Sequence, residues 1–392
     1  MGIDDKPKDK DMSIQLHWYL PTNGDSRDIT GSGDDSHRIK GVAGDFRAPT
    51  LDYLKLVAGA AETLGFSSVL TPTGTWCEDA WITTAALSQH TRRLKFLVAF
   101  RPGFISPTLA AHQAATFQRL TGGRLNINIV TGGDPVEQKR FGDHASHDER
   151  YARTGEFLHI FRSLGAQAVA GPALDFSGDH YRIEGARLSA SPHPAPPVFF
   201  GGASPAAEHV AARHADVYLA WGETPAQIRE RQARVSALAR EHGRSLAFGI
   251  RLHVISRDTE AEAWAQADRL LARVDPARVS EALALFSRTE SVGQQRMTAF
   301  VREHGERIVQ EGLSARSLEI APNLWAGYGL VRGGAGTALV GSHPQIADRI
   351  AEYQALGLTH FILSGQPHIE EAYWFAEGAG SVLRERGLWQ PD

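Results

Sequence analysis

The chain has 392 residues, of which 42% are hydrophobic and 22% are charged, with a formal net charge of −4. This charge argues against a surface for nucleic acid or for an acidic membrane. The single cysteine, Cys77, excludes an internal disulfide framework. No apolar run approaches the roughly 18 residues of a membrane span, and the charged residues 1–12 lack the apolar core of a signal peptide. We therefore expect a cytoplasmic globular protein with a disordered tail at residues 1–12.

Eight short apolar runs of strand length recur along the chain, each rich in Val, Ile, Phe or Tyr. They cover residues 14–20, 68–72, 95–100, 125–130, 198–201, 217–221, 248–255 and 360–364. Stretches with helical spacing separate most of them, at 51–64, 81–89, 109–120, 151–164, 225–241, 260–271 and 344–356. This alternation predicts an α/β fold, a (β/α)8 TIM barrel formed as one domain by residues 13–392. A doubly wound open sheet is the main alternative, although no GxGxxG fingerprint follows a strand.

Two segments are too long for ordinary loops and are expected to be insertions, near residues 166–197 and 275–329. The first contains a strand-like stretch at 181–183, and the second is mostly helical. A mobile lid is expected near 322–341, where glycines surround a single cation, Arg332. An arginine in that setting suits an anionic ligand that is closed off from water. The alternative is a solvated arginine on an exposed loop.

An ordered set of motifs between about residue 14 and residue 376 resembles the two-component alkanesulfonate monooxygenases of the bacterial-luciferase-like group. The motifs are WYLPTNGD, PTGTWCEDAW, LKFLVAFRPG, SPTLAAHQAAT, NIVTGGDP, HDERY, FFGGAS, YLAWGETP, FGIRLHVI, SVGQQRM, NLWAG, GLVRGGAGTALVG and SGQPHIEEAY. No single motif is decisive, but the ordered set is specific.

The resemblance implies a barrel enzyme that uses reduced FMN (FMNH2) and O2 to cleave the carbon–sulfur bond of a sulfonate, releasing sulfite and an aldehyde. It also implies a separate NAD(P)H-dependent flavin reductase as partner and a homo-oligomer, either a dimer or a tetramer. No nucleic-acid or membrane partner is expected. No metal is expected either, because the cluster around His368 lacks the HExxH spacing.

The residues suit an anionic substrate. A sulfonate stays ionised at biological pH, so its site needs fixed cations. Arg251 and His253 alternate along the strand predicted at 248–255, which places both on one face near the barrel mouth. With Arg332, they match family positions that bind substrate or support catalysis. A salt-bridged strand end is the alternative, and the acid or base role remains open between His253 and Arg332.

A phosphate site is expected after the strand at 198–201, where Gly202 and Ser204 precede a helix whose free amides can hold an anion. By resemblance, Tyr151 reaches the same phosphate. Asn128 and Thr131 are expected along the edge of the flavin ring, although they can also cap the next helix.

Two further residues are expected near the cofactor. Cys77 resembles a family cysteine beside the flavin, where it packs or donates a weak hydrogen bond. Trp221 ends a predicted strand and would present its indole to flavin or substrate; a core tryptophan is the alternative.

Substrate choice is predicted from two departures from the family. Most relatives have histidine at Asn23 and tyrosine at Gln366, so carboxamides replace bulky rings. With His368 as a further neighbour, such a site suits a hydroxylated sulfonate, and sulfoquinovose is the favoured candidate. The alternatives are a general alkanesulfonate or methanesulfonate monooxygenase, a deazaflavin-dependent or sulfone-cleaving oxidoreductase, and a non-catalytic flavin- or sulfonate-binding protein.

Overall fold

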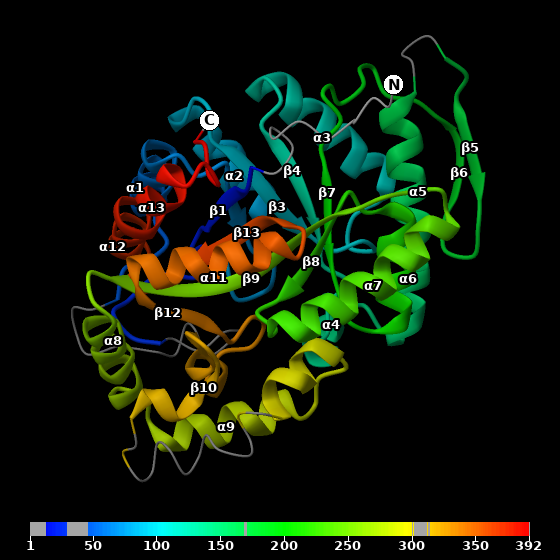
Figure 1. Ribbon diagram of the computed structural model, residues 1–392. Helices are drawn as coiled ribbons and strands as arrows, with labels where there is room; N and C mark the ends of the chain where they lie inside the picture. Colours follow the sequence, from blue (N-terminus) through cyan, green and yellow to red (C-terminus); the bar gives the residue numbers. More distant parts are fainter. Residues whose placement is uncertain are drawn as a thin grey trace, which may run out of the picture.

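Eight parallel strands close into a barrel in the computed structural model, which describes residues 13–29, 46–167, 171–299, 301, 312 and 314–391 (Figure 1). In spatial order the strands are β9 (Ala247–Arg257), β13 (Leu358–Ser364), β1 (Gln15–Tyr19), β2 (Ser68–Thr71), β3 (Lys95–Phe100), β4 (Leu125–Ile129), β7 (Val198–Gly201) and β8 (Val217–Trp221). Pairing of β8 with β9 closes the ring. The predicted (β/α)8 barrel is confirmed, and the open-sheet alternative is excluded by this closing pair.

Helices surround the barrel, and their first residues are set by local capping. The helices between the barrel strands, and the first helix after the last of them, are α1 (Leu51–Leu64), α2 (Ala80–Leu87), α3 (Pro107–Thr121), α4 (Pro135–Arg140), α5 (His147–Ala166), α6 (Pro205–His214), α7 (Pro225–Glu241), α8 (Glu260–Ala272), α11 (His343–Ala355) and α12 (His368–Tyr373). A π-helical turn (Trp374–Ala379) and α13 (Gly380–Glu385) continue α12. Ser146 shows the common pattern, because it accepts from the amide of Glu149 while Glu149 accepts from the Ser146 amide.

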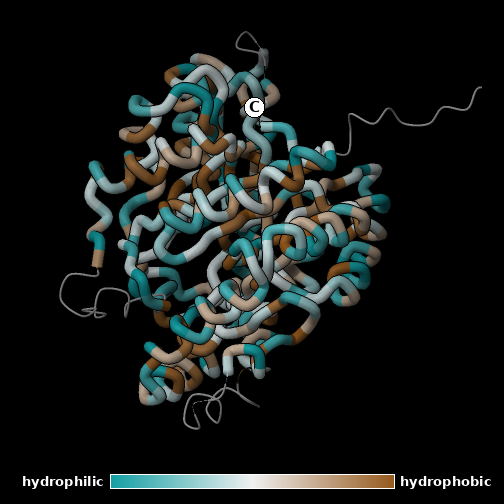
Figure 2. Tube along the Cα trace, turned by 60° about the vertical axis from the view of Figure 1, so that its left-hand side comes forward, coloured by the Kyte–Doolittle hydropathy of each residue, from teal (hydrophilic) through white to brown (hydrophobic). Residues whose placement is uncertain are grey.

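The apolar faces of these helices pack on the outside of the barrel and form the main core. Hydrophobic and hydrophilic stretches alternate along the surface helices in Figure 2, as amphipathic helices require. Among the described helices, none has the length and apolar character needed to cross a bilayer.

Both predicted insertions contain regular structure. In the first, β5 (Leu174–Ser177) and β6 (Arg182–Ala186) form an antiparallel hairpin beside α5. The second contains α9 (Pro276–Phe286), a helix over residues 292–299, β10 (Glu319–Ala321) and β11 (Leu324–Trp325). The tail at 1–12 and most of the polar loop 26–47 lie outside the described residues.

The segment expected as a lid differs from the featureless loop that its glycines suggest. It contains β11, a 3-10 helix (Gly327–Leu330) and β12 (Ala338–Ser342). β12 pairs with the second half of β9, from His253 to Arg257, and β11 and β10 extend that sheet. Backbone pairing stabilises these strands despite the glycines, and the longest stretch of this segment without helix or strand is 331–337.

A polar pair lies inside the barrel near the amino ends of the strands. His17 Nε2 and His360 Nδ1 are 3.0 Å apart, and His17 Nδ1 lies 2.7 Å from the Ser68 hydroxyl. Burial lowers the pKa of His360 to about 4 and, together with His360, holds the pKa of His17 well below its usual value. Both rings are therefore neutral in the folded protein at neutral pH.

This pair predicts a loss of stability in mild acid. The unfolded chain binds a proton at His360 below about pH 6.5 while the folded chain does not, so stability is present above that pH and falls as the pH falls. His360→Gln should remove about 2 kcal/mol of the decrease in unfolding free energy between pH 7 and pH 5, measured by urea unfolding. The exposed His112 supplies the control, because His112→Gln should leave the pH dependence as it is. An unchanged pH dependence in His360→Gln would contradict the prediction.

Candidate active site

Arg251 and His253 on β9 meet at the carboxyl end of the barrel, where Ser364 ends β13. The Arg251 guanidinium donates to the Ser364 hydroxyl at 2.9 Å and to the Leu252 carbonyl at 2.6 Å, and it lies 5.0 Å from the centre of the Tyr19 ring. Burial, and next the charge of Arg332, lower the pKa of Arg251 to about 9. The alternative of a salt-bridged strand end does not hold, since all the hydrogen bonds of this guanidinium go to neutral oxygens.

His253 uses both of its ring nitrogens. Nε2 lies 3.1 Å from the Ala335 carbonyl, which only accepts, so this nitrogen carries the hydrogen. Nδ1 therefore accepts from the Ser364 hydroxyl at 2.7 Å. The ring stacks on Tyr328 at 3.9 Å between centroids. Burial, followed by Arg251 and Arg332, holds the pKa of His253 well below its usual value.

Arg332 is 6% exposed, which rules out the solvated alternative. Its guanidinium lies 5.7 Å from the centre of the same Tyr19 ring, and its Nη1 has no hydrogen-bond partner. Two guanidinium groups therefore face one phenol. Over the part of the chain that the structure describes, neither forms an ion pair with a carboxylate. Like charges held close in a buried place favour an anion between or beside them.

The loops after β1 and β13 add polar groups to this end of the barrel. His368 is 1% exposed and its ring lies 5.5 Å from that of Tyr19, with Nδ1 bonded to Asp25 and Nε2 without a partner. Asn23 is 4% exposed, and its Oδ1 has no partner. Gln366 is buried two residues before His368. A polar ligand bound at this end of the barrel would provide hydrogen-bond partners for Asn23 Oδ1 and His368 Nε2.

Four of the residues predicted for cofactor binding come together at the start of α6. Burial raises the pKa of the Tyr151 hydroxyl, while hydrogen bonds with Ser204 and Thr131 oppose the rise. Gly202 has φ 152°, and a Cβ there would lie 2.5 Å from Ala207 Cβ and 3.1 Å from the Tyr151 hydroxyl. Ser204 caps the helix, whose first amides point toward this corner.

The remaining predicted residues lie around the rim. Burial raises the pKa of the Cys77 thiol to about 12, so it is a neutral group, and its sulfur lies 3.7 Å from the Gly74 carbonyl. Asn128 is half-buried on β4, opposite Ala99. Trp221 is half-buried at the end of β8, in register with Arg251.

Four residues at this site escape the sequence analysis: Tyr19, Asp25, Tyr328 and Ser364. Each lies inside a stretch that the analysis had singled out: Tyr19 within a predicted strand, Asp25 after it, Ser364 at the end of another, and Tyr328 in the segment expected as a lid. A search for every polar side chain just after a barrel strand would have found Asp25 and Ser364.

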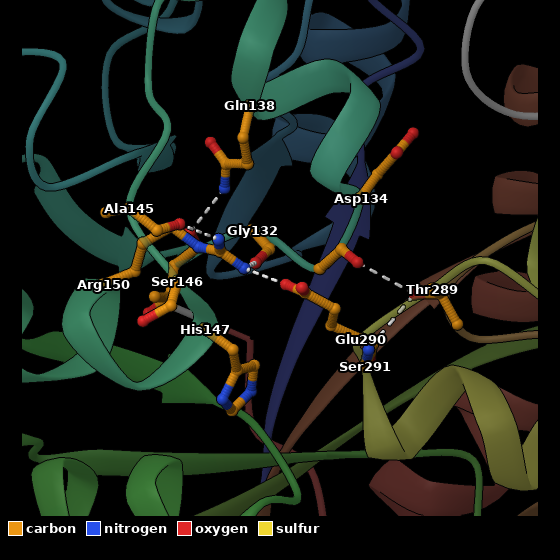
Figure 3. A network of polar contacts seen from close by, with 12 residues as sticks. Gly132, Asp134, Gln138, Ala145, Ser146, His147, Arg150, Thr289, Glu290 and Ser291 are labelled. Atoms are coloured by element: carbon orange, nitrogen blue, oxygen red, sulfur yellow. Dashed lines mark hydrogen bonds and ion pairs between the residues drawn. The ribbon is translucent and has the colours of Figure 1, made fainter.

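The second insertion is clamped onto the loop after β4 (Figure 3). The Arg150 guanidinium, on a side chain only 2% exposed, donates to Glu290 at 2.6 Å and to the Gly132 carbonyl at 3.3 Å. The Gly133 carbonyl accepts from the hydroxyl of Thr289 and the amide of Glu290, both at 3.0 Å. Further along the insertion, Gln294 Oε1 accepts from the amide of Gly334 at 2.7 Å, two residues after Arg332.

The profile of the family described as luciferase-like monooxygenase matches residues 14–360. The chain belongs to this family. Among solved structures, it resembles riboflavin lyase RcaE with a modified FMN and riboflavin (20% identity, TM-score 0.75, covering 97% of this chain and 93% of that one). It also resembles the EDTA monooxygenase EmoA from Chelativorans sp. BNC1 (20%, 0.72, 97% and 96%) and DmoA from Hyphomicrobium sulfonivorans (18%, 0.69, 96% and 89%). At these identities the structural likeness concerns the fold.

The clamp predicts a change in local stability. Glu290→Gln should weaken the hold of residues 287–299 on the barrel, because it removes the charge that faces the buried Arg150. The pair is half-open to solvent at Glu290, so we expect trypsin to cleave after Arg288 or Arg296 only about two- to fivefold faster. Glu281→Gln, which removes an exposed pair with Arg278 on the same insertion, is the matched control. Equal cleavage rates in the two variants would refute the clamp.

Proposed function

We propose that the protein is an FMNH2- and O2-dependent monooxygenase that cleaves the carbon–sulfur bond of an organosulfonate. The observation that carries the proposal is the pair of buried guanidiniums, Arg251 and Arg332, facing one Tyr19 ring without a carboxylate partner among the described residues. A sulfonate is anionic at every biological pH and offers three acceptor oxygens. Fixed arginines suit it better than a titrating group does.

The residues at the start of α6 fit the phosphate of FMN. Gly202 allows the backbone to lie close against the start of the helix, where a Cβ would collide with Ala207, and the hydroxyls of Tyr151, Ser204 and Thr131 lie near the first amides of the helix. Support comes from RcaE, which has a modified FMN, and from the monooxygenase EmoA. Reduced FMN supplies the electrons with which O2 is activated, and a separate NAD(P)H-dependent flavin reductase would deliver it. The neighbouring F420-dependent enzymes make the deazaflavin the alternative cofactor to test.

The chain's own groups have distinct tasks in this proposal. Arg251 and Arg332 hold the sulfonate head, and Ser364 fixes the orientation of Arg251 and His253. Tyr328 and Tyr19 wall the head group off from water. Cys77, neutral at physiological pH, packs beside the cofactor and does not act as a nucleophile.

Sulfoquinovose is the favoured substrate, and the products would be sulfite and the 6-oxo derivative of glucose. The support is a pair of buried polar atoms without partners at the mouth, Asn23 Oδ1 and the Tyr328 hydroxyl. Each costs about 1–3 kcal/mol when left unsatisfied in a buried site, and the hydroxyls of a sugar can satisfy them. A plain alkyl chain offers no such groups.

The first test is sulfite release with FMN, a flavin reductase, NADH and air. We expect release from sulfoquinovose at a kcat/KM at least about tenfold above that for linear alkanesulfonates, the value of one well-made hydrogen bond. Release from alkyl chains alone would refute the sugar substrate but keep the reaction. Flavin binding without sulfite release from any sulfonate would favour the non-catalytic alternative.

Substrate specificity should change when Asn23 and Gln366 are replaced by the residues that most relatives carry. The double variant Asn23→His with Gln366→Tyr should lower kcat/KM for sulfoquinovose by about 10- to 100-fold, because the two rings fill space and remove hydrogen-bonding groups. Activity on a linear alkanesulfonate should fall much less or rise. A double variant that keeps full activity on the sugar would refute the role of these carboxamides.

The two buried arginines, Arg251 and Arg332, should lower the stability of the ligand-free protein and strengthen the binding of a sulfonate. Arg332→Gln relieves the repulsion with Arg251, so the ligand-free protein should melt at a higher temperature in thermal unfolding. The same variant should lose about 100-fold in kcat/KM for the sulfonate, because a charged hydrogen bond is lost. Arg278→Gln on the surface of α9 is the control for removing a positive charge. Unchanged sulfonate turnover in Arg332→Gln would contradict the assignment.

A further inference from the structure

Asp25 and His368 form a fully buried pair at the mouth of the barrel. Asp25 follows β1 and is 0% exposed, whereas His368 begins α12 after β13 and is 1% exposed. The ring Nδ1 lies 2.8 Å from Asp25 Oδ1, and the backbone amide of His368 donates to Asp25 Oδ2 at 2.8 Å. The Tyr53 hydroxyl donates to Oδ2 as well, and the Ser26 amide donates to Oδ1. The carboxylate therefore holds the histidine by both its ring and its backbone.

These contacts fix the tautomer of the ring. Asp25 accepts four hydrogen bonds, from the ring and the amide of His368, the Tyr53 hydroxyl and the Ser26 amide, and such bonds favour the ionised carboxylate. Because an ionised carboxylate only accepts, Nδ1 carries a hydrogen. In the neutral ring, Nε2 is then a free lone pair.

Nε2 of His368 is buried and has no partner, and the ring lies 5.5 Å from Tyr19, whose ring also contacts Arg251 and Arg332. His253 differs, because Ser364 and the Ala335 carbonyl occupy both of its nitrogens. Of the two histidines in this cluster, only His368 keeps a nitrogen free to take a proton.

We propose that His368, oriented by Asp25, is the proton acceptor of the reaction, and that His253 positions Ser364 and Arg251. This inference rests on the proposed sulfonate monooxygenase function. It makes His368 a catalytic residue, with Asp25 as its positioning residue. Tyr53 acts one step further out, through Asp25.

The reaction needs such an acceptor. The carbon bearing the sulfonate loses one hydrogen as a proton to His368 Nε2, and the electron pair of the C–S bond leaves with sulfur as sulfite. One atom of O2 becomes the aldehyde oxygen, and the other leaves as water with the two hydrogens and two electrons of reduced FMN. The proton then passes to solvent. One sulfonate, one O2 and one FMNH2 thus give one aldehyde, one sulfite, one water, one FMN and one proton.

The test compares sulfite release with flavin oxidation, using the full-length protein with a flavin reductase and sulfoquinovose. In His368→Ala we expect kcat for sulfite to fall by about 100-fold or more. Oxidation of reduced flavin should continue within about twofold, with hydrogen peroxide replacing sulfite as product. Substrate deuterated at the sulfonate-bearing carbon should show a larger isotope effect on sulfite release than in the wild type, because proton removal has become slow. Added imidazole should restore part of the rate.

Matched variants separate catalysis from folding. His360→Gln changes another buried histidine at the opposite end of the barrel and should leave the isotope effect unchanged. His253→Gln should raise KM for the sulfonate without that isotope signature. Tyr53→Phe removes one hydrogen bond from Asp25 and should shift the pH profile of kcat while the protein stays folded.

Several results would overturn the inference. Full sulfite release by His368→Ala, or a loss that imidazole does not rescue and that leaves the isotope effect unchanged, refutes a proton-acceptor role. The isotope signature in His253→Gln instead of His368→Ala returns that role to His253. If the wild type releases sulfite from no sulfonate, the proposed function itself fails, and the inference fails with it.

Discussion

The site depends on one strand that belongs to two sheets. The first half of β9 closes the barrel between β8 and β13, and its second half pairs with β12, which follows the insertion. Arg251 pairs with Trp221 of β8 and Ile362 of β13, whereas His253 pairs with Ser364 of β13 on one side and with Ala338 of β12 on the other, where β12 follows β8 along β9. The alternation of a strand turns both side chains to the same face. The Ser364 hydroxyl, at the end of β13, then joins the two.

Around that junction several buried polar and charged groups lack a hydrogen-bond or ion-pair partner within the protein, among them Arg332 Nη1 and His368 Nε2. Such groups reduce stability unless a partner arrives. In other places the chain pairs its buried charges well, as Arg257 does with Glu371 and Arg231 with Glu223. The contrast between these satisfied pairs and the cluster at Arg251 and Arg332 distinguishes a structural ion pair from a place for a ligand.

Much of this architecture can be predicted from the sequence because parallel barrel strands are buried on both faces and therefore appear as short apolar runs. The run at 198–201 matches β7 at both ends, and the helix predicted at 225–241 matches α7. The strands β10 and β11 have only three and two residues, too few to show a period, and neighbouring strands determine their formation. Asp25 is inconspicuous for another reason: an aspartate in a loop with Pro, Asn and Gly looks like ordinary turn chemistry until the fold brings His368 to it. Whether a buried polar atom lacks a hydrogen-bond partner likewise depends on three-dimensional packing and is not visible in the sequence.

The insertion grips two loops at once, since Thr289 and Glu290 hold the turn after β4 while Gln294 holds Gly334 beside Arg332. The stretch from Thr289 to Gln294 thus connects the turn after β4 with the loop that carries Arg332. Two loops fastened to one short helical segment cannot open independently. Thermodynamic linkage makes such a connection reciprocal. If a ligand at one loop strengthens the attachment of this segment and so promotes binding at the other loop, the second ligand promotes binding of the first by the same free energy. The segment at 287–299 therefore connects the two loops physically, through its contacts with Gly133 and Gly334.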